Sequence, residues 1–227
     1  MRKLVLFDID GTLVLTGGAG IRAMTRAIED VLGHSDALDG IAVAGRTDWA
    51  ILADAVRMLN RELDAPMFDR LRDHYVSNLA IEIEHPGRGT KGVMPGVTDL
   101  LRVLERRGDA FLGLLTGNFE EGARIKLSYF GLWHYFACGA FGGDACDRNA
   151  LVPFAVSRAK ACGLPELLPS EVLVVGDTPH DVACARAAGA TPVGVATGSF
   201  TVDQLRDSGA DIVFSDLRDT DAFLRLL

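Results

Sequence analysis

LVLFDIDGTL, residues 4–13, is the stretch that decides how this chain folds. Its short apolar run, closed by a Gly-Thr turn signal, predicts a buried strand. Asp8 and Asp10 stand at the end of this run, and strand residues two apart point the same way. Ligands of open α/β sheets bind beyond the carboxyl ends of the strands. The stretch therefore predicts a site there, with a hard divalent cation, one nucleophilic carboxylate and one acid/base carboxylate. An ordinary Asx turn is the alternative.

The composition is that of a globular protein with a sizeable core: 227 residues, of which 48% are hydrophobic and 24% charged. A formal net charge of −8 argues against nucleic acid as a partner, but not against an anionic substrate beside a metal or a local cation. No apolar run approaches the ~18 residues of a membrane span, and Asp8 and Asp10 interrupt the N-terminal run, which argues against a signal peptide. The four cysteines lack paired metal spacing, which predicts reduced thiols in a cytoplasmic protein.

Helical periodicity dominates residues 17–89, and glycine-rich loops stand at both ends of this segment. Three apolar series recur at helical spacing: Ile21, Met24, Ile28 and Val31; Leu52, Val56, Leu59 and Leu63; Leu71, Tyr75, Leu79 and Ile83. We expect residues 17–89 to form an α-helical cap, inserted into a core made of residues 1–16 and 90–227. Flexible loops at both ends are what a mobile cap needs, although ordinary surface connections would look the same.

The rest of the chain alternates between helices and strands. Apolar runs predict strands near residues 110–115, 136–141, 172–175, 192–195 and 211–214. This alternation predicts a doubly wound, mostly parallel sheet, a Rossmann-like α/β core with right-handed crossovers. In such a sheet, the polar residues that follow each strand gather at the same edge as Asp8 and Asp10.

Thr116, Gly117 and Asn118 follow the second core strand. They offer a hydroxyl and backbone N–H groups near a helix start, which is where proteins bind anions. We expect this turn to bind phosphate. Asn118 also fits a simple helix cap, with Glu121 three residues on as in a capping box.

Asp177 ends another buried strand, after a glycine. With Asp8 it makes a pair of oxygen ligands suited to Mg²⁺. Asp181 fits two interpretations, direct ligation of the metal or helix capping with support of the site from behind, because Thr178 and Asp181 match N-cap and N3 of a helix. His180 is expected to be exposed or packed in a loop, since Mg²⁺ prefers oxygen.

Two arginines are candidate anion ligands. Arg148 is expected to lie opposite the phosphate, because a guanidinium can bridge a carboxylate and a phosphate; a surface arginine is the alternative. Arg46, in the segment Gly45–Asp48 of the expected cap, could bind a carboxylate or phosphate of a substrate. The same segment also fits a helix start with Thr47 or Asp48 as the cap.

Three motifs together resemble those of the haloacid dehalogenase-like hydrolase superfamily. They are Asp8-x-Asp10-x-Thr12, Thr116-Gly117-Asn118 and Gly176-Asp177-x-x-x-Asp181, which occur in the order of the family and span essentially the whole chain. The helical segment between the first two resembles the small α-helical cap of the phosphoglycolate phosphatase-like branch. One departure is that Arg148, in Asp147–Pro153, stands where the family has a lysine. Lys126 and Lys160 are weaker candidates for that cation, since both fit better on helix surfaces.

The resemblance implies roles for these residues. Asp8 would attack phosphorus and form an aspartyl-phosphate, and Asp10 would protonate the leaving oxygen and then deprotonate water. Mg²⁺ would be held by Asp8, the main-chain carbonyl of Asp10, and Asp177, with Asp181 as a further candidate. Thr116 and a basic residue would bind the phosphoryl oxygens.

The carboxylic acid at position 10 favours a phosphomonoester phosphatase or a phosphomutase, because dehalogenases and phosphonatases of the family lack it. We therefore expect a Mg²⁺-dependent phosphatase that acts on a small phosphorylated metabolite, such as a phosphoglycolate-like compound or a sugar phosphate. A phosphomutase of the same family is one alternative. The other is a phosphate-sensing regulatory domain; such receiver domains lack a helical cap after the first strand.

Overall fold

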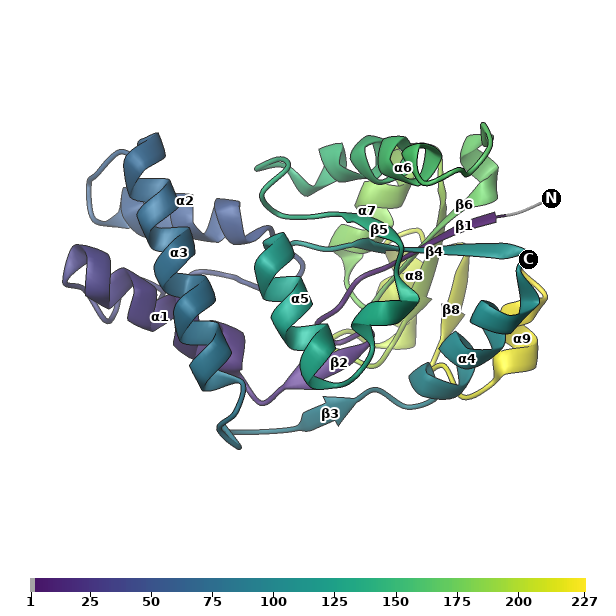
Figure 1. Cartoon of the computed structure of the whole chain (residues 1–227), viewed down its shortest axis with the longest axis horizontal. Coiled ribbons are helices and arrows are strands. Elements are labelled where there is room, and N and C mark those ends of the chain that lie inside the picture. Colours follow the sequence, from purple (N-terminus) through teal and green to yellow (C-terminus); the bar gives the residue numbers. More distant parts are fainter. Residues whose placement is uncertain (1–2) are drawn as a thin grey trace.

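The computed structural model describes residues 3–227, which form a parallel sheet between layers of helices, with a further group of helices at one end (Figure 1). The six strands of the sheet run in the order β5-β4-β1-β6-β7-β8, and each neighbouring pair is parallel. The strands are β1 (Lys3–Phe7), β4 (Ala110–Leu115), β5 (Cys138–Ala140), β6 (Val172–Gly176), β7 (Thr191–Val195) and β8 (Ile212–Phe214). The predicted α/β core is confirmed, and β1 lies between the two strands that carry the other motifs.

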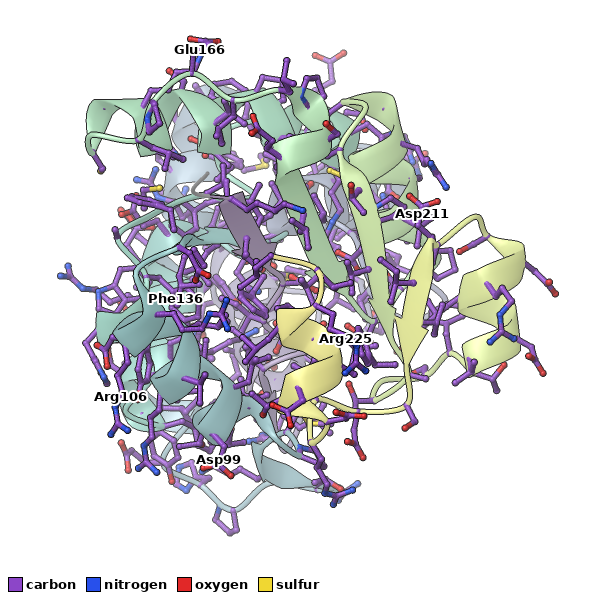
Figure 2. All side chains as sticks on the ribbon, turned by 90° about the vertical axis from the view of Figure 1, so that its right-hand side faces the viewer. Asp99, Arg106, Phe136, Glu166, Asp211 and Arg225 are labelled. Atoms are coloured by element: carbon purple, nitrogen blue, oxygen red, sulfur yellow. The ribbon has the colours of Figure 1, made fainter. Side chains whose placement is uncertain are left out.

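Helices cover both faces of the sheet, and the side chains of β1 alternate between them. Val5 and Phe7 belong to an apolar cluster with α4, α5 and α9, whereas Leu4 and Leu6 belong to a second cluster with α6 and α7. These helices are α4 (Val97–Arg107), α5 (Glu120–Tyr129), α6 (Leu151–Ala161), α7 (Pro179–Ala187) and α9 (Thr220–Leu224). Figure 2 shows Glu166 and Arg106 projecting from the periphery of these layers. The strand is therefore buried on both sides, as its unbroken apolar run predicts.

The remaining core elements are short. They are α8 (Val202–Asp207) and the 3₁₀ turns η1 (Trp133–Tyr135), η2 (Arg148–Ala150) and η3 (Pro169–Glu171). The turn η2 contains Arg148 and lies directly before α6 begins.

A helical insertion lies between β2 (Val14–Thr16) and β3 (Lys91–Val93), which pair antiparallel as a two-stranded ribbon. It consists of α1 (Ala19–Leu32), α2 (Asp48–Met58) and α3 (Ala65–Glu82), with an apolar cluster of its own. Leu71, Tyr75 and Leu79 are buried along α3, as their spacing predicts. The two connections to the core run side by side, so the insertion meets the sheet at the edge where β1 ends (Figure 1).

Two details of the predicted helices are wrong. The series from Leu52 to Leu63 continues past the end of α2, because Asn60 adopts a left-handed backbone with φ of 55° and ends the helix. Ile21 is 45% exposed, since the buried stripe of α1 runs through Ala23 and Ala27 instead. Among residues 3–227, none of the helices is long and apolar enough to cross a membrane.

Candidate active site

The carboxyl ends of β1, β4 and β6 open into a cavity of about 420 Å³ between the core and the helical insertion. The core side of this cavity carries the residues predicted from the motifs: Asp8, Asp10, Thr116, Gly117, Asn118, Arg148 and Asp177. The insertion contributes Met24, Ile51 and Tyr75, together with Arg46 and Asp48. The topology has thus brought together residues that are up to 169 positions apart, counted from Asp8 to Asp177.

Three buried carboxylates lie close together on the core side of the cavity, and two of them, Asp8 and Asp177, line it. Asp8, Asp177 and Asp181 each offer an oxygen within 4.8 Å of the others, and they are the one such acidic group in the described part of the chain. Burial, and then the charges of Asp181 and Asp8, raise the pKa of Asp177 to about 8. Burial also raises the pKa of Asp8 to about 6, although Arg148 opposes this shift. A cation placed among these oxygens would be strongly stabilised.

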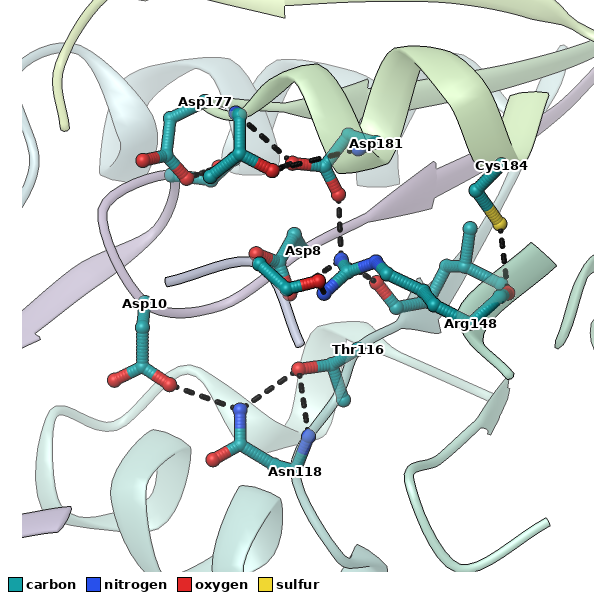
Figure 3. A network of polar contacts seen from close by, with 12 residues as sticks. Asp8, Asp10, Thr116, Asn118, Arg148, Asp177, Asp181 and Cys184 are labelled. Atoms are coloured by element: carbon teal, nitrogen blue, oxygen red, sulfur yellow. Dashed lines mark hydrogen bonds and ion pairs between the residues drawn. The ribbon is translucent and has the colours of Figure 1, made fainter. Parts of the chain in front are cut away.

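Arg148 lies within this cluster (Figure 3). Its Nη2 is 2.5 Å from Asp181 Oδ1 and 3.2 Å from Asp8 Oδ1, and the residue is only 7% exposed. The interpretation as a surface arginine is therefore wrong. Burial alone would lower the pKa of Arg148, but the carboxylates of Asp181 and Asp8 raise it. Within residues 3–227, its buried Nε has no hydrogen-bond partner.

Both carboxylate oxygens of Asp181 accept hydrogen bonds from neighbouring residues. Oδ2 accepts hydrogen bonds from the N–H and the hydroxyl of Thr178, at 3.0 and 2.8 Å, which completes the predicted capping box of α7. Oδ1 accepts from Arg148. His180, the neighbour of Asp181, is exposed, as expected. Asp181 is thus held in place by Thr178 and in turn holds the guanidinium of Arg148.

Asp177 is held from two sides. Thr12 donates from its hydroxyl to Asp177 Oδ1 at 2.9 Å. A Cβ added at Gly198, after β7, would lie 1.7 Å from Asp177 Oδ2, so any side chain there would displace this carboxylate. Sequence reasoning missed this loop, because a glycine and a serine after a strand give no chemical signal of their own. Thr197, next to Gly198, donates to the carbonyl of Gly11 at 2.6 Å and ties the loop to the first motif.

Asp10 belongs to a second group of polar side chains, on the other side of Asp8 (Figure 3). Its Oδ2 accepts from Asn118 Nδ2 at 2.9 Å and from Lys126 Nζ at 2.6 Å. Asn118 also donates to Thr116 Oγ1 at 2.7 Å, and Phe119, rather than Asn118, is the N-cap of α5. The capping interpretation of Asn118 is therefore wrong.

Lys126 is a buried residue, and its predicted place on a helix surface is wrong. It is 4% exposed and lies in the buried stripe of α5 with Gly122, Ala123 and Leu127. A lysine within an apolar stripe at helical spacing is a signal that sequence reasoning could have used. Lys160, in contrast, is on the surface, where it pairs with Glu166 at 2.5 Å.

The start of α2 contacts the core directly. The N–H of Asp48 donates to the Gly117 carbonyl at 2.6 Å, and Asp48 Oδ2 accepts from the N–H of Phe119 at 2.9 Å. A Cβ at Gly117 would lie 1.9 Å from the Arg46 carbonyl oxygen, so this approach requires glycine. Burial raises the pKa of Asp48 to about 6, although Lys126 opposes the shift.

Thr47 is the N-cap of α2, as one of the alternatives predicts. Arg46 lines the cavity, while its guanidinium lies 2.6 Å from Asp54 on the insertion. In this arrangement the guanidinium is paired within the insertion.

Known proteins match this chain over nearly its whole length. A family model described as haloacid dehalogenase-like hydrolase matches residues 2–189. A phosphoglycolate phosphatase of Mannheimia succiniciproducens is 27% identical, with 96% of each chain covered. One from Rhodospirillum rubrum is 33% identical, with 95% of this chain and 88% of that protein covered. The crystal structure of a predicted phosphatase from Clostridium acetobutylicum shares the fold, with a TM-score of 0.71, 18% identity and 99% of each chain covered.

The chain therefore belongs to the haloacid dehalogenase-like hydrolase family, in the branch of its phosphoglycolate phosphatase-like members. It is an enzyme of the phosphatase class.

Proposed function

We propose that this enzyme is a Mg²⁺-dependent phosphatase that hydrolyses a small phosphomonoester through an aspartyl-phosphate on Asp8. The observation that carries the proposal is the pairing at the end of β1. Asp8 is buried against Arg148 beside two further carboxylates, whereas Asp10, two residues on, faces the cavity from a separate group of hydrogen bonds. One carboxylate is thereby suited to hold charge and the other to exchange a proton.

The residues fit a hard divalent cation. The donors are all carboxylate oxygens, they are buried, and burial with mutual repulsion raises the pKa of Asp8 and Asp177. We assign Mg²⁺ to Asp8, Asp177 and the main-chain carbonyl of Asp10, with Asp181 supporting through Thr178 and Arg148 because both its oxygens already accept hydrogen bonds. When bound, Mg²⁺ would neutralise negative charge on Asp8 and on the phosphoryl oxygens.

The chain's own residues supply the remaining chemistry. An oxygen of Asp8 attacks phosphorus, the bond from phosphorus to the leaving oxygen breaks, and that oxygen takes a proton from Asp10. Water then attacks the same phosphorus and gives its proton to Asp10, and the bond from phosphorus to Asp8 breaks, which releases inorganic phosphate. Arg148 and Thr116 hold the phosphoryl oxygens in both steps.

We also propose that the helical insertion, residues 17–89, acts as a cap over the core of residues 1–16 and 90–227. The contacts from Asp48 to Gly117 and Phe119 support this assignment, because they join the insertion to the core beside the cavity. Expulsion of water by closure of such a cap strengthens every charge interaction below it.

The substrate is a small phosphorylated metabolite, and the names of the relatives favour a phosphoglycolate-like compound. The test is phosphate release by the purified chain, with and without Mg²⁺, from phosphoglycolate, sugar phosphates, nucleotides and a generic aryl phosphate. We expect Mg²⁺-dependent release of phosphate. Conversion of a sugar phosphate into its isomer without release would instead identify a mutase, and no turnover by the folded protein would contradict the proposal.

A further inference from the structure

Lys126 is a buried cation that the proposed mechanism does not use. Its side chain is 5% exposed, and its ammonium lies 2.6 Å from both Asp10 Oδ2 and Asn118 Oδ1. An ammonium has three donors, and among residues 3–227 these two acceptors use two of them; Lys126 also lines the cavity. A lysine is seldom buried without a charged partner, and here that partner is the proposed acid/base.

The two carboxylate oxygens of Asp10 differ in their hydrogen bonds. Among residues 3–227, both hydrogen-bond donors to its carboxylate, Asn118 and Lys126, bond to Oδ2. Asn118 is itself held by Lys126 at its carbonyl and by Thr116 at its amide. One oxygen of Asp10 is thus fixed in a closed ring of hydrogen bonds, while the side chain as a whole remains 42% exposed.

The helical insertion leaves room for this ammonium. A Cβ at Gly20 of α1 would lie 3.3 Å from Lys126 Nζ, and the hydroxyl of Tyr75 lies 3.9 Å from the same Cβ position. Lys126 is therefore enclosed by the insertion on one side and by Asn118 on the other. The ring of bonds around Asp10 is held at the contact between core and insertion.

We propose that Lys126 is a positioning residue for Asp10: together with Asn118 it fixes Oδ2, so that Oδ1 is directed at the oxygen that leaves phosphorus. The inference rests on the proposed function. It differs from a role in binding substrate, in which the third donor of Lys126 would hold an oxygen of the phosphate ester. The two roles predict different dependence on the leaving group.

The test compares an alkyl phosphate, whose leaving oxygen needs a proton, with 4-nitrophenyl phosphate, whose leaving oxygen does not. We expect Lys126→Met to lower kcat/KM for the alkyl phosphate about 10- to 100-fold, because a misplaced acid transfers its proton poorly. For the aryl phosphate we expect a loss of about threefold or less, because Asp10 contributes little to that step. The matched control is Lys160→Met, which removes a lysine from a surface ion pair and should change neither value.

A double-mutant cycle completes the experiment. If Lys126 acts through Asp10, Lys126→Met adds no further loss for the alkyl phosphate in an Asp10→Asn background. Equal losses for both substrates, or losses that multiply with those of Asp10→Asn, would overturn the inference and leave Lys126 as a binding or structural residue. Lys126→Gln, which keeps a hydrogen-bond donor, replaces the Met variant if thermal unfolding shows that variant to be poorly folded.

The outcomes separate the two proposals. An unaltered chain without Mg²⁺-dependent activity overturns the proposed function and this inference with it. An active chain in which Asp10→Asn shows the leaving-group dependence but Lys126→Met does not overturns the inference alone.

Discussion

The two aspartates of the first motif are each paired with a cation from a distant part of the chain, yet their surroundings are opposite. Asp8 and Arg148 lie 3.2 Å apart, with side chains 6% and 7% exposed. Asp10 and Lys126 lie 2.6 Å apart, and although the lysine is only 5% exposed, the aspartate is 42% exposed. The end of β1 therefore carries two carboxylates in different environments, which fits the two roles proposed for them. Both carboxylates line the cavity, but Asp8 is buried together with its cation, whereas Asp10 is much more exposed than Lys126.

The largest effect is expected from Asp8→Asn. The change removes the proposed nucleophile, and we expect kcat to fall about 10⁴-fold or more. The fold should persist, because Asp8 lies among like charges and its loss relieves repulsion. Steady-state kinetics and thermal unfolding measure both. Activity near that of the unaltered chain would exclude Asp8 as the nucleophile.

The next effect is that of Arg148→Met, which leaves Asp8 and Asp181 unpaired. We expect a loss of about 10³-fold in kcat and of about 3 kcal/mol in the unfolding free energy of the metal-free protein. The matched control is Arg158→Met, which breaks the more exposed pair with Asp144 and should cost about 1 kcal/mol or less. Equal losses in denaturant unfolding of the two variants would contradict the buried role of Arg148.

The pH dependence of stability sharpens the same comparison. The pKa values of Asp8 and Asp177 are about 6 and about 8 in the folded protein, against 3.8 as the ordinary value. Folding without metal therefore takes up protons, and the unfolding free energy should fall as the pH rises from about 5 to 8. Added Mg²⁺ should raise the melting temperature most at the upper end of this range. In Asp177→Asn, the fall in unfolding free energy with rising pH and the stabilisation by Mg²⁺ should both be weaker. If both are unchanged, these carboxylates are not their cause.

The smallest effect is expected from Arg46→Met. Because the guanidinium pairs with Asp54 on the insertion, we expect KM to change about threefold or less. A rise in KM of tenfold or more, without loss of stability, would show that Arg46 leaves Asp54 to bind substrate.

The sequence predicts the sheet and the gathering of Asp8, Thr116 and Asp177 well, because each follows an apolar run in a parallel sheet. The sequence does not decide which partners a long side chain contacts. Lys126 fits a helix surface by charge and is buried instead, because Asp10 and Asn118 provide acceptors from distant parts of the chain. Asn118 likewise fits a helix cap until its partners are known.

Close approach between backbone segments is the other limit of sequence-based prediction. The sequence predicts that Gly117 belongs to an anion-binding turn. Its contact with Arg46 and Asp48, however, depends on how the insertion packs on the core. Gly198 gives no signal at all, although it lies directly against Asp177. Such contacts follow from the three-dimensional arrangement and have no local pattern.

Trapping the covalent intermediate is the strongest test of whether the phosphoryl group is transferred to Asp8. In Asp10→Asn, an aryl phosphate should still react with Asp8, while the slowed attack of water lets the aspartyl-phosphate accumulate. Acid quenching, borohydride reduction and peptide mass mapping should then find homoserine at position 8. Reduction at another residue, or none while substrate is consumed, would contradict the account.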